Sequence, residues 1–225
     1  MPDLKKHFNE TAESYDTLTN KSLMKYDEMV EALINAIPDN ENPRVLDLGC
    51  GTGNITKKLL ERFPEAKVTC LDLSDKMIKI AKEKLSDYNN IEYVLDDFTI
   101  IDIIDNYDAI ISSLALHHIP SNEAKKEMYQ HIHDALKEGG VFYNADVIEP
   151  NSSYNEVLCE RMSEKYMKEQ GLSTEDINDF KQKRDDNDIP ITIVEHLKLL
   201  EEVGFKQIDI IWKYYSSAIY GGTRL

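Results

Sequence analysis

The chain has 225 residues, 41% hydrophobic residues and a formal net charge of −16. These values are typical of a globular protein with one sizeable core, and no apolar run approaches the roughly 20 residues that span a bilayer. The acidity argues against a nucleic-acid partner, because phosphate binding depends on clustered Lys and Arg. Three scattered cysteines and an N-terminus without an apolar leader predict a cytoplasmic location.

Apolar periodicity predicts helical structure over residues 4–37, closed by a proline-bounded polar turn. Short apolar runs then alternate with helical stretches, which indicates a parallel sheet covered on both faces. We expect strands at 45–48, 68–72, 91–95, 107–112 and 141–146, and helices at 55–63, from Ser74 to Leu85 and at 121–137.

Residues 151–189 interrupt this alternation with a helix that carries an apolar stripe and a second helix that begins at a capping box. Another capping box at Thr192 begins a helix that ends at Gly204, and two strands, 205–212 and 214–220, can form an antiparallel hairpin. The expected fold is α/β: a Rossmann-like, doubly wound, mostly parallel seven-stranded sheet with an antiparallel edge hairpin and a helical insert. Its expected divisions are a helical cap (1–43), a cofactor-binding core (44–150), the insert or lid (151–189) and the C-terminal helix with the last two strands (190–225).

The sequence DLGCGTG at 47–53 lies between the first predicted strand and its helix. Glycines let the backbone turn sharply and approach a ligand, and the helix start offers unpaired N–H groups. A dinucleotide site of the G-x-G-x-x-G/A type would need Gly or Ala where this chain has Asn54. Asp47 would also sit badly beside a pyrophosphate, whereas its carboxylate suits a ligand with a cationic amino group.

This stretch resembles motif I of the class I methyltransferases that depend on S-adenosylmethionine (SAM), and the order of the remaining elements resembles that family over nearly the whole chain. The resemblance implies that SAM is the cofactor. The cofactor-binding residues that it implies in and after this loop are Asp47, Gly49, Cys50, Gly51, Thr52, Gly53, Asp72, Leu73 and Met77. Asp72 ends the second predicted strand, where an acid can accept both ribose hydroxyls. A glycine turn that only packs helix on strand is the alternative.

Three further segments are similar to the family pattern. After the third strand, Asp97 would accept from the adenine amino group and Phe98 would pack on the ring, although Asp96 competes for the role and a polar loop exit fits as well. After the fourth strand, the resemblance places Ser113 and His118 against SAM, and His118 could act as a base or orient a substrate. Near the N-terminus, Tyr15 would close the methionyl end, although a plain amphipathic helix explains the same residues.

The insert supplies two candidate substrate residues. Tyr154 belongs to the apolar stripe and could line an acceptor pocket, although such a stripe is more often core or interface. Arg184 ends a Lys-Gln-Lys-Arg run that resembles carboxy-SAM synthases, in which an arginine at the corresponding place holds a carboxylate; a solvated helix end is the alternative.

Together these residues predict an enzyme, a SAM-dependent methyltransferase with a small-molecule acceptor. The alternatives are a carboxy-SAM synthase-like enzyme and a SAM-binding regulatory protein without turnover. We expect no metal site, because no third ligand stands at a recognisable spacing from the histidine pair. The insert could pair across a two-fold axis to form a homodimer.

Overall fold

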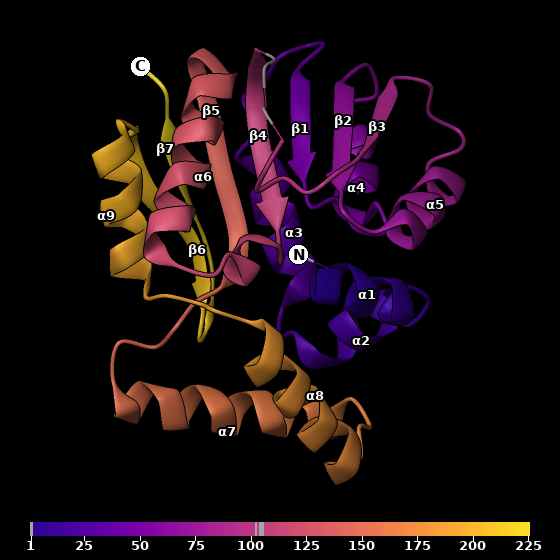
Figure 1. Cartoon of the computed structure of the whole chain (residues 1–225), viewed down its shortest axis with the longest axis vertical. Coiled ribbons are helices and arrows are strands. Elements are labelled where there is room, and N and C mark those ends of the chain that lie inside the picture. Colours follow the sequence, from indigo (N-terminus) through magenta and orange to yellow (C-terminus); the bar gives the residue numbers. More distant parts are fainter. Residues whose placement is uncertain (1, 102, 104–105) are drawn as a thin grey trace.

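A sheet of seven strands with helices on both faces forms the centre of the computed structural model, which describes residues 2–101, 103 and 106–225 (Figure 1). The strand order is β3-β2-β1-β4-β5-β7-β6, with β1 to β5 parallel and β7 antiparallel to both of its neighbours. The strands are β1 (Arg44–Leu48), β2 (Lys67–Asp72), β3 (Ile91–Leu95), β4 (Tyr107–Ser113), β5 (Leu136–Val147), β6 (Lys206–Tyr214) and β7 (Ser217–Thr223). The predicted Rossmann-like architecture with an antiparallel edge hairpin is confirmed.

The helices occur where the apolar periodicity predicts them, with two differences in extent. They are α1 (Pro2–Thr11), α2 (Tyr15–Ser22), α3 (Tyr26–Asn35), α4 (Asn54–Arg62), α5 (Asp75–Lys84), the short 3₁₀ turn η1 (Leu116–His118), α6 (Asn122–Ala135), α7 (Ser153–Glu169), α8 (Thr174–Asn187) and α9 (Ile193–Val203). The expected helical region 4–37 is three helices, and Lys25, with φ of 62°, turns the chain between α2 and α3.

The helix predicted over 121–137 ends earlier, and β5 begins at Leu136 instead of after the glycine pair. The reason is tertiary: Leu136 is in register with Tyr107 of β4, and Gly139 donates its N–H to the carbonyl of Arg224 near the C-terminus (2.7 Å). The two glycines are therefore held in the sheet by their neighbours, which local turn propensity does not predict.

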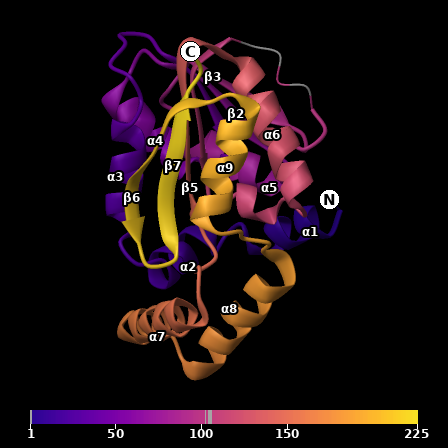
Figure 2. The same ribbon diagram turned by 90° about the vertical axis from the view of Figure 1, so that its left-hand side faces the viewer.

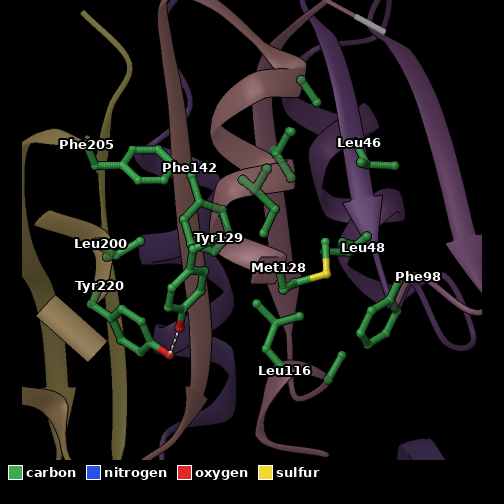
Figure 3. Close-up of a cluster of buried hydrophobic side chains, with 14 of the residues drawn as sticks. Leu46, Leu48, Phe98, Leu116, Met128, Tyr129, Phe142, Leu200, Phe205 and Tyr220 are labelled. Carbon is green, nitrogen blue, oxygen red and sulfur yellow. Dashed lines mark hydrogen bonds between the residues drawn. The ribbon is translucent and has the colours of Figure 1, made fainter. Parts of the chain in front are cut away.

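Apolar side chains form one cluster on each face of the sheet. One cluster includes Met29 and Leu33 of α3 and Leu59 of α4. The other includes Met128 of α6 and Leu200 of α9, and Figure 3 shows it extending from Phe205 to Phe98 and Leu116. Because Phe98 and Leu116 follow the carboxyl ends of β3 and β4, the core continues up to the edge where open α/β sheets bind ligands.

The four helix starts that the sequence marks by capping residues are confirmed. Ser74 and Ser121 accept from the backbone N–H groups of Met77 and Ala124, and Ser173 and Thr192 form complete capping boxes. A cap of this kind contributes about 1 kcal/mol. These caps fix the residue at which α5, α6, α8 and α9 each begin.

Helices α1, α2, α7 and α8 lie beyond the carboxyl ends of the parallel strands; Figures 1 and 2 show this layer below the sheet. Within it, the predicted apolar stripe of α7 is divided: Tyr154 and Val157 are 78% and 65% exposed, whereas Met167 is buried. Helix α7 meets α2, where Tyr166 donates to the carbonyl of Asn20 (3.0 Å). Among the described residues, none of the helices combines the length and the apolar character that crossing a membrane requires.

Candidate functional site

The glycine loop between β1 and α4 is fixed by backbone hydrogen bonds. Gly49 and Cys50 donate to the carbonyl of Leu71 at the end of β2, at 2.8 and 3.0 Å. Gly49 and Gly51 both have positive φ angles, 76° and 52°, which favour glycine. A Cβ on Gly49 would lie 2.5 Å from that of Ala115, whereas a Cβ on Gly51 would meet nothing within 4 Å. The loop therefore packs closely at Gly49 and leaves open space at Gly51.

Asp72 lies at the end of β2 and faces this open space. Its two carboxylate oxygens each accept one backbone N–H, from Gly51 and from Ser74, both at 2.8 Å. A carboxylate oxygen has more than one lone pair, so both oxygens retain capacity for hydroxyl donors. Burial raises the pKa of Asp72, although the backbone donors oppose that effect. A buried, rigidly held acceptor pair of this kind suits a ribose diol.

A narrow cavity of about 30 Å³ lies against Asp72 and the glycine loop. This volume accommodates about two water molecules. Apart from Asp72, it is bounded mainly by apolar side chains and glycine backbone. The lining residues are Leu4, Phe8, Tyr15, Gly49, Gly51, Asp72, Leu73, Met77, Phe98, Leu114, Ala115 and His118. The structure thus brings together eight of the sequence-predicted site residues, from five separate segments of the chain.

The N-terminal segment covers this cavity. The Phe8 ring of α1 lies edge-on to His118 and to Tyr15, with ring centroids 5.3 and 6.2 Å apart. Asn9 ties α1 to the start of α5, because its side chain accepts from Ser74 Oγ (2.6 Å) and donates to Asp75 (3.0 Å). Burial raises the pKa of the Tyr15 phenol well above its usual range, so this hydroxyl is un-ionised. The cavity is small because α1 rests directly on it.

Asp47, predicted to contact the ligand, lies behind the glycine loop and does not line the cavity. It is completely buried; one carboxylate oxygen accepts from Thr56 Oγ1 (2.5 Å), and the other is buried without a hydrogen-bond partner among the described residues. Burial raises its pKa to about 7. An unpartnered buried carboxylate oxygen beside the loop is compatible with the predicted attraction for an ammonium group, and direct contact stays a prediction.

The other loop residues also lie outside the cavity lining. Thr52 is buried and donates to Asp16 of α2 (2.6 Å), and both side chains accept from Lys84 of α5 (3.0 and 2.7 Å). A Cβ at Gly53 would lie 3.0–3.3 Å from Leu85 and Ala81, so glycine here permits α4 and α5 to pack. Thr52 and Gly53 therefore support the loop in this conformation, and the buried Cys50 belongs to the apolar cluster.

Of the residues predicted to contact adenosine after β3 and β4, only some line the cavity. Phe98 lines the cavity, whereas Asp97 accepts from the backbone N–H and hydroxyl of Thr99 (3.0 and 2.6 Å). Ser113 is half-buried and outside the lining, next to Leu114, whose φ of 53° turns the chain toward the cavity. The roles of Asp97 and Ser113 toward adenosine stay predictions.

The two histidines of η1 have different surroundings. His118 lines the cavity, whereas the buried His117 places Nδ1 2.5 Å from Asp146 at the end of β5. Burial opposes a charge on His117, but Asp146 and Asp188 outweigh it and raise its pKa to about 10. Burial, reinforced by the neighbouring His117, lowers the pKa of His118 to about 4. His118 is therefore a neutral imidazole near neutral pH.

The two substrate candidates in the insert lie away from this cavity. Tyr154 projects from α7 with 78% of its surface exposed. Arg184 pairs with Asp185 (3.0 Å) and lies 3.6 Å from Glu160 of α7. It lines a second cavity of about 260 Å³ together with Glu160, Ser163 and Phe180. Their roles in substrate binding stay predictions.

Sequence reasoning missed several residues that the fold brings to the site. Leu4 and Phe8 of α1 line the cavity, as do Leu114 and Ala115. Asp146 could have been suspected, because it ends a predicted strand at the ligand-binding edge. Asp188, which approaches both histidines of η1, carries no signal in the sequence, because it follows a helix far along the chain.

The chain is similar in sequence to known methyltransferases and to a carboxy-S-adenosyl-L-methionine synthase. Residues 45–140, from β1 to the glycine pair of β5, match the model of a methyltransferase domain family. The chain is 25% identical to the carboxy-S-adenosyl-L-methionine synthase of Nautilia profundicola, over 94% of this chain and 91% of that protein. It is 34% identical to the malonyl-[acyl-carrier protein] O-methyltransferase of Bacillus anthracis, over 49% of this chain and 40% of that protein.

The match to the domain model and the relatives coincides with the glycine loop, Asp72 and the sheet order described above. Together they support a class I SAM-dependent methyltransferase. SAM is the cofactor of this methyltransferase, and the cavity at the carboxyl edge fits it: Gly51 leaves room where a Cβ would intrude, and Asp72 presents a buried acceptor pair.

Solved structures of methyltransferases show the same fold. Human N-acetylserotonin methyltransferase in complex with SAM superposes with a TM-score of 0.65 at 15% identity, over 98% of this chain and 56% of that chain. Phosphoethanolamine N-methyltransferase 2 of Haemonchus contortus, in complex with S-adenosyl-L-methionine, gives 0.66 at 17% identity, over 90% and 45%. The chain thus spans about half the length of these two, and less than half of the O-methyltransferase.

Proposed function

We propose that this enzyme transfers the methyl group of SAM to a small-molecule acceptor, which enters between α1 and the histidine turn η1. The observation that carries the proposal is the cavity lining: beyond Asp72 it consists of apolar side chains, glycines, Tyr15 and His118, with no Lys or Arg among its described residues. Bound SAM supplies an electrophilic methyl group on a sulfonium. An apolar, enclosed surface suits that chemistry, because the leaving group departs neutral and the protein's contribution is alignment and exclusion of water.

The residues divide this work by position. Asp72 would hold the ribose through its two oxygens, and Leu73, Met77 and Phe98 would enclose the nucleoside. Phe8 and Tyr15 would close the opposite end, where the methionyl group extends toward the glycine loop. Because the cavity is much smaller than SAM while α1 rests on it, α1 must move outward for the cofactor to enter and would then close over it.

The test is an assay with SAM labelled on its methyl group and a panel of hydroxyl, amine, carboxyl and thiol acceptors. We expect S-adenosylhomocysteine and one labelled acceptor class, and no product from a variant that cannot bind SAM. Tight SAM binding without any labelled product across the panel would contradict methyl transfer and favour a binding protein without turnover.

A carboxy-SAM synthase-like reaction is the second candidate, supported by the match over 91% of the Nautilia profundicola protein. It requires a cation to hold the added carboxylate, and the candidate is Arg184 on α8, which lies 3.6 Å from Glu160 of α7. Mass spectrometry of nucleosides released from enzyme purified from cells distinguishes the two. Carboxylated SAM, lost in an Arg184→Met variant and retained in Arg161→Met, would favour the synthase; unmodified SAM and S-adenosylhomocysteine alone would favour methyl transfer.

We further propose that the enzyme acts in the cytoplasm and forms a homodimer through the insert. The three cysteines Cys50, Cys70 and Cys159 are all free and buried, as a reducing compartment favours. Tyr154 and Val157 expose apolar surface on one side of α7, which is typical of an interface. Light scattering of the wild type and of Tyr154→Ser/Val157→Ser tests the dimer: we expect twice the chain mass for the first and the chain mass for the second.

A further inference from the structure

Two consecutive histidines and one aspartate converge beside the cavity. His117 and His118 form the end of η1, and Asp188 directly follows α8. One ligand atom from each lies within 4.8 Å of the other two. Asp188 Oδ1 is 3.5 Å from His117 Nε2 and 3.4 Å from His118 Nδ1.

The two distances from Asp188 Oδ1 match those between neighbouring ligands of a tetrahedral metal ion. Zinc bound to nitrogen and oxygen at 2.0–2.2 Å sets neighbouring ligand atoms about 3.3–3.5 Å apart. An N–H···O hydrogen bond would instead bring them to about 2.7–3.2 Å. Asp188 Oδ1 therefore stands at a tetrahedron-edge distance from both nitrogens. His118 Nδ1 also lies 3.1 Å from the carbonyl oxygen of Asn187, a hydrogen bond that Nδ1 would give up when it binds a metal ion.

A second carboxylate orients the first ligand. His117 Nδ1 lies 2.5 Å from Asp146 Oδ1, and the other oxygen of Asp146 accepts from Asn144 Nδ2 (3.1 Å). Metal-bound histidines characteristically donate their other ring N–H to a carboxylate, which fixes the tautomer and strengthens the ligand. With its Nδ1–H given to Asp146, His117 directs Nε2 toward Asp188 Oδ1, and the proton that Nε2 carries in the metal-free protein would leave when a metal ion binds.

The chain around Asp188 is fixed to the histidine turn. The N–H of Ile189 donates to the carbonyl of His117 (2.8 Å). The buried ammonium of Lys125 donates to the carbonyls of Ile189 (2.9 Å) and Ile119, which bridges the two segments. The ligand atoms are thus held by backbone and buried contacts, as a preorganised metal site requires.

We propose that His117 Nε2, His118 Nδ1 and Asp188 Oδ1 bind one transition-metal ion of the Zn²⁺ type. Imidazole nitrogens with one carboxylate oxygen suit Zn²⁺ and Co²⁺ better than Mg²⁺ or Ca²⁺, which take mostly oxygen ligands. Three protein ligands leave a position open, as in catalytic zinc sites. Because His118 lines the cavity, that position can take the hydroxyl or thiol of a methyl acceptor and favour its ionised form, a role that rests on the proposed methyl transfer.

The same three side chains could instead hold only a proton shared between His117 and the carboxylates. His7 of α1 and Lys183 of α8 also face this group: burial and then Lys183 lower the pKa of His7, and Asp188 partly opposes them. Metal binding and a proton-only cluster give different results in a direct titration.

The experiment uses tag-free protein, stripped with a chelator, dialysed and titrated with Co²⁺ and, in competition with a chromophoric chelator, with Zn²⁺. We expect one ion per chain and the intense visible absorption of tetrahedral Co²⁺. Asp188→Ala and His118→Ala should each weaken Zn²⁺ binding at least 100-fold, and Asp146→Asn by about 10- to 100-fold. The matched controls are Asp185→Ala and His131→Ala, which remove an exposed carboxylate and an exposed imidazole and should bind as the wild type does.

Wild-type protein that binds neither ion stoichiometrically would overturn the proposal, as would Asp188→Ala and Asp185→Ala binding with equal affinity in folded samples. Circular dichroism and the melting temperature check that each variant is folded. SAM binding to the stripped protein is measured in the same samples. Binding of SAM without binding of Zn²⁺ would reject the metal site and leave the proposed function intact.

Discussion

The sheet edge that carries Asp72 and the helical layer that covers it are held by different kinds of contact. At the edge, backbone N–H groups of the glycine loop bond to Leu71 and Asp72 in buried surroundings. In the layer, Leu4 is the only buried side chain among those described for α1, and polar contacts with α5 are exposed: Lys5 and Asp75 lie 3.8 Å apart and are 45% and 57% exposed. Exposed ion pairs contribute little, about 0–1 kcal/mol.

This difference indicates a rigid cofactor edge under a cover that can open. Segments with few buried contacts have the lowest local free energies of opening, and binding lids are drawn from them. The narrow cavity under α1 then represents the closed arrangement. Substitutions at the edge should change stability or SAM affinity strongly, and substitutions in the cover should change them mildly.

The largest expected effect concerns the buried Asp47 at the edge. Its pKa is about 7 when folded, against an ordinary value near 3.8, so the folded chain keeps a proton that the unfolded chain has lost. The free energy of unfolding should therefore fall as pH rises from about 4 to about 7 and level off above, by about 4 kcal/mol. For Asp47→Asn, the free energy of unfolding should not show this decline of about 4 kcal/mol between about pH 4 and pH 7. Urea unfolding of both proteins at matched pH values measures it. Identical pH profiles would contradict the burial argument.

Asp72→Asn should lower SAM affinity about 100-fold, because each hydroxyl bonded to a charged acceptor contributes about 1.5–3 kcal/mol. Calorimetric titration with SAM measures it. Asp87→Asn, the same change at an exposed position with no neighbour in the site, is the matched control and should bind SAM as the wild type does. Equal affinities for the two variants would remove Asp72 from the cofactor site.

Comparing Gly49→Ala with Gly139→Ala separates two causes of lost stability: a steric clash of the new Cβ and a backbone conformation that favours glycine. Both glycines have positive φ, 76° and 80°, but only at Gly49 would the new Cβ meet a neighbour, Ala115 at 2.5 Å. We expect Gly139→Ala to cost about 1 kcal/mol and Gly49→Ala about 3 kcal/mol, because strain in a packed region is added. Thermal unfolding of both proteins checks this, and equal losses would mean that the loop is not closely packed.

The smallest effect is expected in the cover. Phe8→Ala removes a ring that contacts Tyr15 and His118 over the cavity, and we expect SAM affinity to fall about 3- to 10-fold, since a ring pair contributes about 0.5–1.5 kcal/mol. Tyr154→Ala, an aromatic truncation on the exposed side of α7, should leave SAM affinity unchanged. A loss at Phe8 as large as that at Asp72 would show that α1 is part of the rigid site.

The sequence predicts the cofactor site at the carboxyl edge of the sheet well, because the loop and strand end that form it depend on neighbouring residues in the chain. The loop from Gly49 to Gly53 is specified by residue types that few conformations accept, and Asp72 follows from its place at a strand end. Asp47 shows the limit of such reasoning: its type and position suggest ligand contact, but the register of β1 between β2 and β4 buries it behind the loop.

The helical layer of α1, α2, α7 and α8 is poorly predicted, because tertiary packing decides which side of each helix is buried. The apolar stripe of α7 is compatible with burial on any side, and the fold exposes Tyr154 while it buries Met167. The approach of Asp188 to His117 and His118 depends on how two distant segments dock. The early start of β5 at Leu136 likewise results from pairing with β4, which overrides the turn signal of the glycines.

The central claim is that the carboxyl edge of this sheet binds SAM through the glycine loop and Asp72. Isothermal calorimetry of the wild-type chain with SAM and with S-adenosylhomocysteine tests it most directly. One saturable site per chain for each ligand is the expected result. The absence of binding heat, together with an unchanged melting temperature at saturating concentrations of both ligands, would contradict it.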